Sequence, residues 1–187
     1  MSTPSGHPGG GGLDPATLTH LDEQGRAHMV DVTAKPLSKR VAVAKCSVVT
    51  TADATRVLGE VQDGLDLVQG ARFAGIQGAK QTAALIPLCH PIRLDRVALD
   101  LTVDVHRIEI SAVTEIVERT GVEMEALTAC AICALTLVKA LIKVDPEASI
   151  EHLTLWHKSG GRSGTWERSR KGGITRAGTE NVAGADG

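Results

Sequence analysis

Residues 97–116 read VALDLTVDVHRIEISAVTEI, and aliphatic residues recur at every second position. The alternation runs from Val97 to Val105 and resumes from Ile108 to Ile116. A period of two is typical of strands that bury one face. The short polar break at His106 and Arg107 predicts that the two strands form an antiparallel hairpin.

The chain that follows this hairpin predicts a helix and a strand. Residues 121–144 carry aliphatic side chains at helical spacing and are rich in Ala, and Pro146 ends the pattern. We expect this helix to be buried. Residues 149–157 complete the domain as a last strand.

The chain that precedes the hairpin predicts a strand and two helices. Residues 40–50 alternate like a strand, and Thr51 or Asp53 is placed to cap a short helix that reaches about residue 61. A second helix covers residues 70–86 and stops at Pro87. Its glycines predict close packing against a neighbouring element.

This order of elements predicts an α+β fold of the ferredoxin-like, split βαβ type. The sheet is antiparallel, with the helices on one face. Because its other face is left free, we expect an oligomer that covers it.

The composition excludes several classes of function. The 187 residues include one Phe, two Trp and no Tyr, while 42% are hydrophobic, so the core must be aliphatic. Single-stranded nucleic acid is usually bound by stacking bases on aromatic side chains, which this chain nearly lacks. A formal net charge of −2 also argues against a duplex-binding protein. We therefore expect no nucleic-acid partner, and any phosphate site must be local.

The chain shows no signal for membrane insertion or secretion. No purely apolar run approaches the roughly 20 residues that span a bilayer, and the N-terminus lacks an apolar stretch. Four cysteines are too few for a secreted disulfide framework, so we expect reduced thiols, a cytoplasmic location and no membrane partner. Glycine is concentrated at both ends, which predicts flexible tails over 1–17 and 167–187 around a domain over 18–166.

Three short stretches could carry chemistry. His90, next to Cys89 and between a helix and a strand, could exchange protons near neutral pH, or it could be a structural histidine. Glu123 and Glu125 flank Met124 at the start of the long helix, where they could bind a guanine-like group or simply stabilise the helix dipole.

The third stretch is the glycine-rich loop 157–164, whose Lys158 and Arg162 could hold an anion. A chain end often looks like this, and the loop lacks the P-loop pattern. The thiols of Cys130 and Cys133 raise a zinc alternative together with Cys89 and His90. Since both lie in an apolar helix, we interpret them as core residues and expect no metal.

Several motifs together resemble the MoaC family of molybdenum cofactor biosynthesis. They are LTHLD (18–22), AHMVDVT (27–33), AGIQ (74–77), LIPLCHP (85–91), TGVEMEALT (120–128) and KSGG (158–161). The resemblance implies a ferredoxin-like subunit in a homohexamer, a trimer of dimers, with active sites at subunit interfaces. It implies a nucleotide-derived substrate, 3′,8-cyclo-7,8-dihydro-GTP, converted to cyclic pyranopterin monophosphate with release of pyrophosphate. It implies no metal or organic cofactor.

The same resemblance implies roles for individual residues. The expected catalytic residues are His90, Glu125 and Lys139. The expected substrate-binding residues are Asp31, Arg40, Lys80, Cys89, His90, Glu123, Met124, Glu125 and Lys158.

Three positions depart from the family pattern. Gly64 stands where the family has a catalytic lysine, Lys139 where it has an aspartate, and Ile142 where it has a second lysine. Three interpretations follow: a working synthase (a lyase) with rearranged cations, a paralogue with another substrate or a partial reaction, or a non-catalytic partner of a complete MoaC. Under the first, Lys139 or the nearby Lys143 supplies the missing charge.

Overall fold

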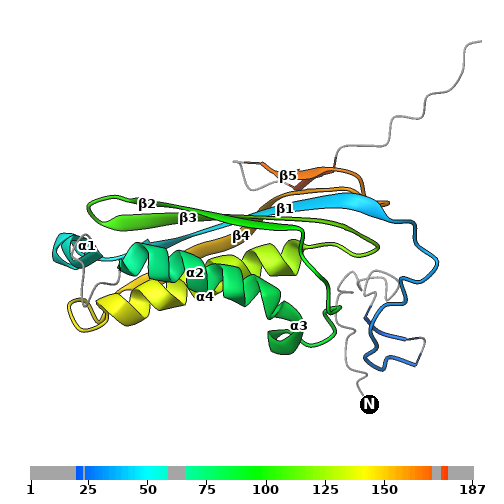
Figure 1. Ribbon diagram of the computed structural model, residues 1–187, viewed down its shortest axis with the longest axis horizontal. Coiled ribbons are helices and arrows are strands. Elements are labelled where there is room, and N and C mark those ends of the chain that lie inside the picture. The colour runs from blue at the N-terminus through cyan, green and yellow to red at the C-terminus, as the bar shows by residue number, and fades with distance from the viewer. Residues whose placement is uncertain (1–19, 23, 59–65, 170–173, 177–187) are drawn as a thin grey trace, which may run out of the picture.

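A computed structural model describes residues 20–22, 24–58, 66–169 and 174–176, in which helices cover one face of an antiparallel sheet (Figure 1). The strands lie in the order β2-β3-β1-β4-β5-β6. Their bounds are β1 Ser38–Val49, β2 Arg96–Val103, β3 Arg107–Glu118, β4 Ser149–Ser159, β5 Trp166–Arg168 and β6 Ile174–Arg176. The helices of the described residues are α1 Ala52–Leu58, α2 Leu67–Lys80, α3 Thr82–Leu85 and α4 Glu123–Leu141.

The predicted hairpin is confirmed as β2 and β3, which pair antiparallel with Leu99 opposite Ala112. Asp104 N donates to Arg107 O at 2.8 Å and closes the reversal. Strand β2 therefore ends at Val103, two residues earlier than the alternation predicts. β1 lies in the middle of the sheet, with Ala44 opposite Ala112 of β3 on one side and Leu155 of β4 on the other.

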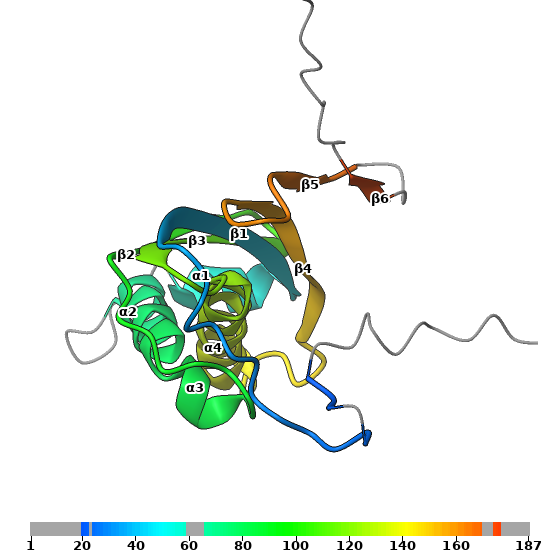
Figure 2. The same ribbon diagram turned by 90° about the vertical axis from the view of Figure 1, so that its right-hand side faces the viewer.

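The order of elements confirms the α+β, ferredoxin-like fold with helices on one face. β1 is followed by helices and the β2–β3 hairpin, and α4 then leads to β4, which returns beside β1. The end view shows α2 and α4 side by side under the sheet, with β5 and β6 beyond β4 (Figure 2). The residues that β1 turns toward the helices, such as Ala44 and Val48, are fully buried.

The second predicted helix differs in detail from the structure. It begins at Leu67 because Asp66 caps it: Asp66 Oδ1 accepts from Val68 N at 2.9 Å and from Gln69 N at 3.2 Å. It breaks at Gln81, whose φ of −102° and ψ of 4° lie outside the helical range, so that α2 and α3 are separate helices.

The glycines of α2 allow the close packing that the sequence predicts. A Cβ on Gly75 would lie 2.8 Å from Ala129 O, and one on Gly78 would lie 2.7 Å from Ile132 Cγ1. Both distances are too short for a real contact, so α2 and α4 approach each other only because these positions lack side chains.

Helix α4 is the core helix of the domain. It is long and apolar enough to cross a membrane by those two criteria, but it packs against the sheet and α2, where Ala126, Cys130, Ala134 and Leu137 are fully buried. It ends at Leu141 instead of Val144, and the chain passes into a turn in which Val144 N donates to Leu141 O at 2.8 Å.

The aliphatic core expected from the composition is confirmed. Its largest fully buried side chains are Ile, Leu and Val, among them Ile108, Ile110 and Leu137. Phe73 is 64% exposed, so the single phenylalanine contributes little to this core.

Candidate functional site

Three cavities surround His90, on the loop between α3 and β2. We call the largest, about 770 Å³, the basic cavity; Lys35, Arg40, Arg119, Lys158 and Arg162 line it. The acidic cavity, about 230 Å³, is lined by Cys89, Met124 and Glu125. Both share Glu123 and His20. The third, about 400 Å³, is the Lys80 cavity, which shares Glu125 with the acidic one. His90 lines all three.

The loop that carries Cys89 and His90 is held in an unusual conformation. Leu88 has a φ of 64°, a left-handed value that a residue with a side chain adopts only at a cost of roughly 1 kcal/mol or more. Cys89 N donates to Ile86 O at 3.4 Å, and His90 Nε2 lies 2.9 Å from Val30 O. The loop therefore turns Cys89 and His90 into the cavities.

The first turn of α4 supplies two carboxylates with different environments. Glu123 is half-buried, and its Oε1 accepts from Lys158 Nζ at 3.1 Å. Gly121 leaves room for this carboxylate, because a Cβ there would collide with it. Glu125 is only 4% exposed, and burial together with the charge of Glu123 raises its pKa to about 7. Glu125 can therefore both give and take a proton near neutral pH.

Cys89 is a thiol and not a thiolate at neutral pH. Burial and the neighbouring Glu125 carboxylate raise the pKa of the Cys89 thiol above its ordinary value. Because the thiolate is the nucleophilic form, this environment favours a contact role over covalent attack.

Arg40 is fixed in the wall of the basic cavity by the main chain. Its Nε donates to Glu118 O at 2.9 Å and its Nη2 to Arg119 O at 3.0 Å, so no carboxylate neutralises it in these contacts. Gly161, with a φ of 71°, lies against the guanidinium, and a Cβ there would collide with Arg40 Nη1. The glycine-rich loop thus passes close to a rigid, charged side chain.

The basic cavity has a strong excess of positive charge. Among the described residues that line it, Glu123 is the sole carboxylate, against the five basic side chains named above. Arg119 is also oriented by the main chain, since its Nε donates to Lys35 O at 3.0 Å. Such a cavity suits a polyanion better than a single carboxylate.

The structure brings together most of the residues that the sequence singles out. His90, Cys89, Glu123, Met124 and Glu125 lie around the acidic cavity. Arg40, Lys158 and Arg162 line the basic cavity, and Lys80 lies on the other side of Glu125.

Asp31, Lys139 and Ile142 do not line these cavities. The Asp31 carboxylate accepts from Thr33 N at 2.9 Å and from Thr33 Oγ1 at 2.7 Å, which lowers the pKa of Asp31. Lys139 is exposed, and 14 residues of helix place it about 21 Å along α4 from Glu125. Ile142 is 51% exposed. Gly64 lies outside the described residues.

Lys35 and Arg119 of the basic cavity lie outside the motifs quoted above, and His20 lies in the LTHLD motif without an assigned role. All three line the basic cavity. Arg119 precedes the Thr120-Gly121 motif directly, and that adjacency was the available signal. The LTHLD motif was the available signal for His20, whereas Lys35 reaches the cavity through a segment without regular structure, so spacing could not reveal it.

The helical cysteines belong to the core. Cys130 and Cys133 are fully buried, and burial raises the pKa of Cys133 to about 12. Cys46 Sγ lies 3.7 Å from Cys130 O. All four cysteines are free. Within the described residues, no group of three or more His, Cys, Asp and Glu side chains is placed to hold a metal ion.

Comparison with known proteins gives a consistent result. Residues 29–161 match the model of the MoaC family. A cyclic pyranopterin monophosphate synthase of Thermomicrobium roseum is 49% identical over 157 residues, which cover 82% of this chain and 94% of that protein. A protein of the same name from Streptomyces coelicolor is 46% identical over 171 residues, covering 90% of this chain and all of that protein.

A third relative, cyclic pyranopterin monophosphate synthase 2 of Mycobacterium tuberculosis, is 48% identical over 153 residues, covering 81% of this chain and 91% of that protein. The motifs around His90 and Glu125 lie inside the region that the family model matches. The chain belongs to the MoaC family.

Proposed function

We propose that this protein is a cyclic pyranopterin monophosphate synthase, a lyase of molybdenum cofactor biosynthesis. Its substrate would be 3′,8-cyclo-7,8-dihydro-GTP, which it would convert to cyclic pyranopterin monophosphate with release of pyrophosphate. The observation that carries the proposal is that a cavity lined by cations and a cavity lined by two glutamates, one of them buried, meet at His90. A cytoplasmic location belongs to the same proposal and agrees with the four free cysteines.

The basic cavity is proposed to hold the triphosphate. Arg40 and Arg119 are each oriented by a hydrogen bond to a main-chain carbonyl, so their charges remain available to a ligand. Lys158 forms an ion pair with Glu123, and a phosphate could replace that carboxylate as its partner. Preorganised cations of this kind stabilise the charge that develops on a leaving pyrophosphate.

The acidic cavity is proposed to hold the purine-derived ring. Carboxylates accept hydrogen bonds, so Glu123 and Glu125 suit the ring N–H and amino groups of a guanine-like base. Met124 is 38% exposed between them and offers an apolar contact. Cys89, on the facing loop, completes this wall. Because the chain has almost no aromatic side chains, the ring is proposed to be held by these hydrogen bonds and apolar contacts and not by stacking.

Proton transfer is proposed to fall to His90 and Glu125. Opening and reclosing a ring requires protons to be removed and returned, and groups that titrate near neutral pH do this best. The pKa of Glu125, raised to about 7, meets that requirement. The reaction is proposed to run on these side chains, without a metal or an organic cofactor.

We further propose that a neighbouring copy completes each site within a homohexamer, a trimer of dimers. Lys139 lies about 21 Å from Glu125 along α4, too far for both to act on one substrate within a single chain. If Lys139 is catalytic, it must enter the site of another copy. Asp31, which lies outside the cavities of its own chain, is proposed to act across the same interface.

A non-catalytic role is favoured by one observation. Ile142, where the resemblance implies a lysine, is 51% exposed and offers apolar surface in place of charge. Under this alternative, the chain pairs with a complete MoaC and contributes only part of each site. Co-expression would then give mixed hexamers, whereas homohexamers alone would reject it.

Complementation of a bacterial strain that lacks its own synthase tests the main proposal. The intact chain should restore molybdoenzyme activity. Since the strain has no other MoaC to supply missing residues, restored activity would have to come from this chain alone. Glu125→Gln, of nearly the same size, should not restore it although the protein accumulates. Failure of the intact chain to restore activity would reject the proposal.

A further inference from the structure

A segment without regular secondary structure forms one wall of the site. We call residues 24–37 the strap. They contribute nothing to the buried hydrophobic core, which begins at Ala42 in the described chain. Val30, Val32 and Lys35 of the strap line the basic cavity. Two main-chain carbonyls bind the strap to the site: Val30 O lies 2.9 Å from His90 Nε2, and Lys35 O accepts from Arg119 Nε at 3.0 Å.

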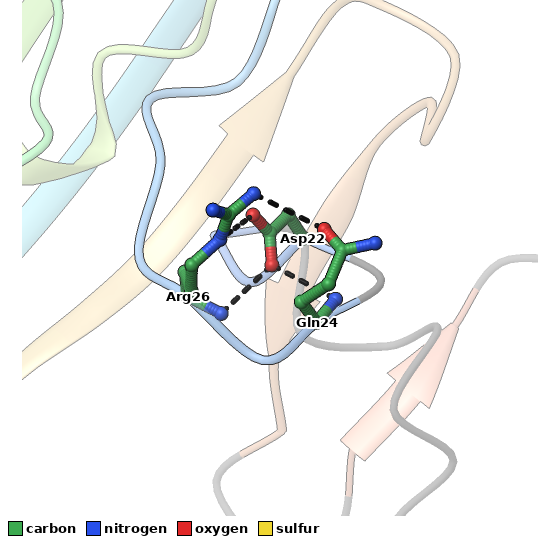
Figure 3. A network of polar contacts seen from close by, with 3 residues as sticks. All are labelled: Asp22, Gln24 and Arg26. Atoms are coloured by element: carbon green, nitrogen blue, oxygen red, sulfur yellow. Dashed lines mark hydrogen bonds and ion pairs between the residues drawn. The ribbon is translucent and has the colours of Figure 1, made fainter.

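A local turn gives the start of the strap a defined shape. Asp22 Oδ1 accepts from Gln24 N at 2.9 Å and from Arg26 N at 2.8 Å, and Asp22 Oδ2 accepts from Arg26 Nε at 2.8 Å (Figure 3). Leu21 and Ala27 also form a β-bridge across this turn. Farther along, Asp31 and Thr33 form a second turn directly after Val30. The Val30 carbonyl is therefore presented between two ordered turns.

His90 is constrained from its own side as well. The left-handed Leu88 and the ring of Pro91 limit the main chain around it. With its backbone fixed and its Nε2 against Val30 O, the imidazole has one nitrogen committed to the strap, and its Nδ1 has no hydrogen-bond partner among the described residues.

The chemistry of the contact determines which nitrogen carries the hydrogen. A carbonyl oxygen can only accept, so Nε2 must be the donor, and in the neutral ring the lone pair lies on Nδ1. We propose that the Val30 carbonyl is a positioning group that holds His90 in the Nε2–H tautomer, so that Nδ1 exchanges the proton with the substrate. This inference rests on the proposed function only in assigning a substrate to that proton.

The proton balance of the step is simple. The Nδ1 lone pair forms a bond to a proton as the N–H or O–H bond of the substrate breaks, and the bonding electrons stay on the substrate. The resulting imidazolium keeps its Nε2–H···O contact, which is stronger because the donor is now charged. Return of the proton from Nδ1 restores the resting tautomer.

Nitrogen NMR of the resting protein, labelled with ¹⁵N at histidine, tests the tautomer directly. Loss of one signal pair in His90→Gln assigns the residue. We expect Nε2 to carry a hydrogen that exchanges slowly with solvent, and Nδ1 to be unprotonated in the neutral ring. A hydrogen on Nδ1, or rapid exchange of the Nε2 hydrogen, would overturn the proposal. No substrate is needed, so the result does not depend on the proposed function.

A single-atom change separates positioning from a structural role. Replacing the amide between Val30 and Asp31 by an ester weakens the Val30 carbonyl as an acceptor and keeps every side chain. The chain can be assembled by ligation at its own Cys46. The matched control is an ester between Met29 and Val30, which weakens the neighbouring carbonyl instead.

The two esters should differ in one respect. The Val30–Asp31 ester should speed exchange of the His90 Nε2 hydrogen and lower kcat by about 3- to 10-fold, the size expected for weakening one hydrogen bond, with KM changed less than kcat. The Met29–Val30 ester should leave the His90 signals unchanged. Equal effects of both esters on the His90 signals, or none from the first, would contradict positioning by Val30.

Discussion

Lys158 Nζ lies 3.1 Å from Glu123 Oε1, although the two residues are 35 positions apart in the sequence. The pair stands where the basic and acidic cavities meet, and both of its members line the basic cavity. It joins the glycine-rich end of β4 to the first turn of α4. A ligand that spans the two cavities would contact both groups.

Replacing Lys158 by Met should weaken binding more than it slows the chemical step. The change removes a cation from the basic cavity and leaves Glu123 without its partner. A charged hydrogen bond contributes about 1.5–3 kcal/mol, so we expect KM to rise at least about 10-fold. Steady-state kinetics measure this. Lys45→Met is the matched control, because Lys45 lies 4.7 Å from the Trp156 ring, outside the three cavities; an equal rise in its KM would contradict the assignment.

Gly161→Ala should disturb Arg40, while Gly164→Ala should not. Both glycines have positive φ, 71° and 62°, so both variants carry similar backbone strain. A Cβ at 161 collides with the Arg40 guanidinium, whereas one at 164 meets nothing within 4 Å. We expect affinity for inorganic triphosphate, measured by calorimetry, to fall roughly 10-fold for Gly161→Ala beyond any loss in Gly164→Ala. Equal losses would show that strain alone is responsible.

Glu125→Gln should change both activity and the pH dependence of stability. Loss of a proton-transfer group lowers kcat by about 10²- to 10⁴-fold. The carboxyl has an ordinary pKa of 4.5 and a folded pKa of about 7. The neutral form therefore favours folding, and the stability of the native protein falls as pH rises through this range.

The side-chain amide of the Glu125→Gln variant does not titrate, so the variant should gain stability relative to the native protein between pH 4.5 and 7. The relative gain should be on the order of 3 kcal/mol above about pH 7. Chemical denaturation at several pH values measures it. A difference that does not vary with pH would show that Glu125 titrates normally in the folded protein.

Asp145→Asn should lower the thermal stability of the protein without changing the candidate functional site. The Asp145 carboxylate accepts from Thr50 Oγ1 at 2.7 Å and Thr51 N at 3.0 Å, and so ties the end of α4 to the end of β1. These bonds lower the pKa of Asp145 below its ordinary 3.8. The stabilisation is therefore present above that value and is lost as pH falls through the lowered pKa.

Thermal melts should show a Tm several degrees lower for Asp145→Asn at neutral pH, with the gap to the native protein closing in acid. Asp100→Asn is the control, since Asp100 is exposed on β2. A gap that stays constant down to the most acidic pH would contradict the role of the charged carboxylate.

The fold could be predicted from the sequence wherever the apolar residues of a single element repeat with the period of a strand or a helix. The alternation over 97–116 predicts the β2–β3 hairpin, and the Ala-rich stripe predicts the buried α4. The break at Gln81 could not be predicted in this way, because the apolar spacing continues across it into α3.

The acidic part of the site was also accessible from the sequence, since Glu123, Met124 and Glu125 are consecutive. The basic part was accessible only in part: the glycine-rich loop indicated Lys158 and Arg162, but the cations of this cavity come together only through the fold. Arg40 reaches the carbonyls of Glu118 and Arg119, 78 and 79 residues away. Lys35 and His20 lie in the basic cavity because of the course of the segment that precedes β1. The spacing of residues in that segment does not predict this course.

Conversion of the cyclised nucleotide should need no protein other than this chain. The most direct measurement incubates the purified protein with enzymatically made 3′,8-cyclo-7,8-dihydro-GTP and follows pyrophosphate and, after oxidation, pterin fluorescence in the same sample. We expect both products to appear together in equal amounts, and Glu125→Gln to give neither. Release of neither product by the intact chain, or of pyrophosphate without the pterin, would contradict this expectation.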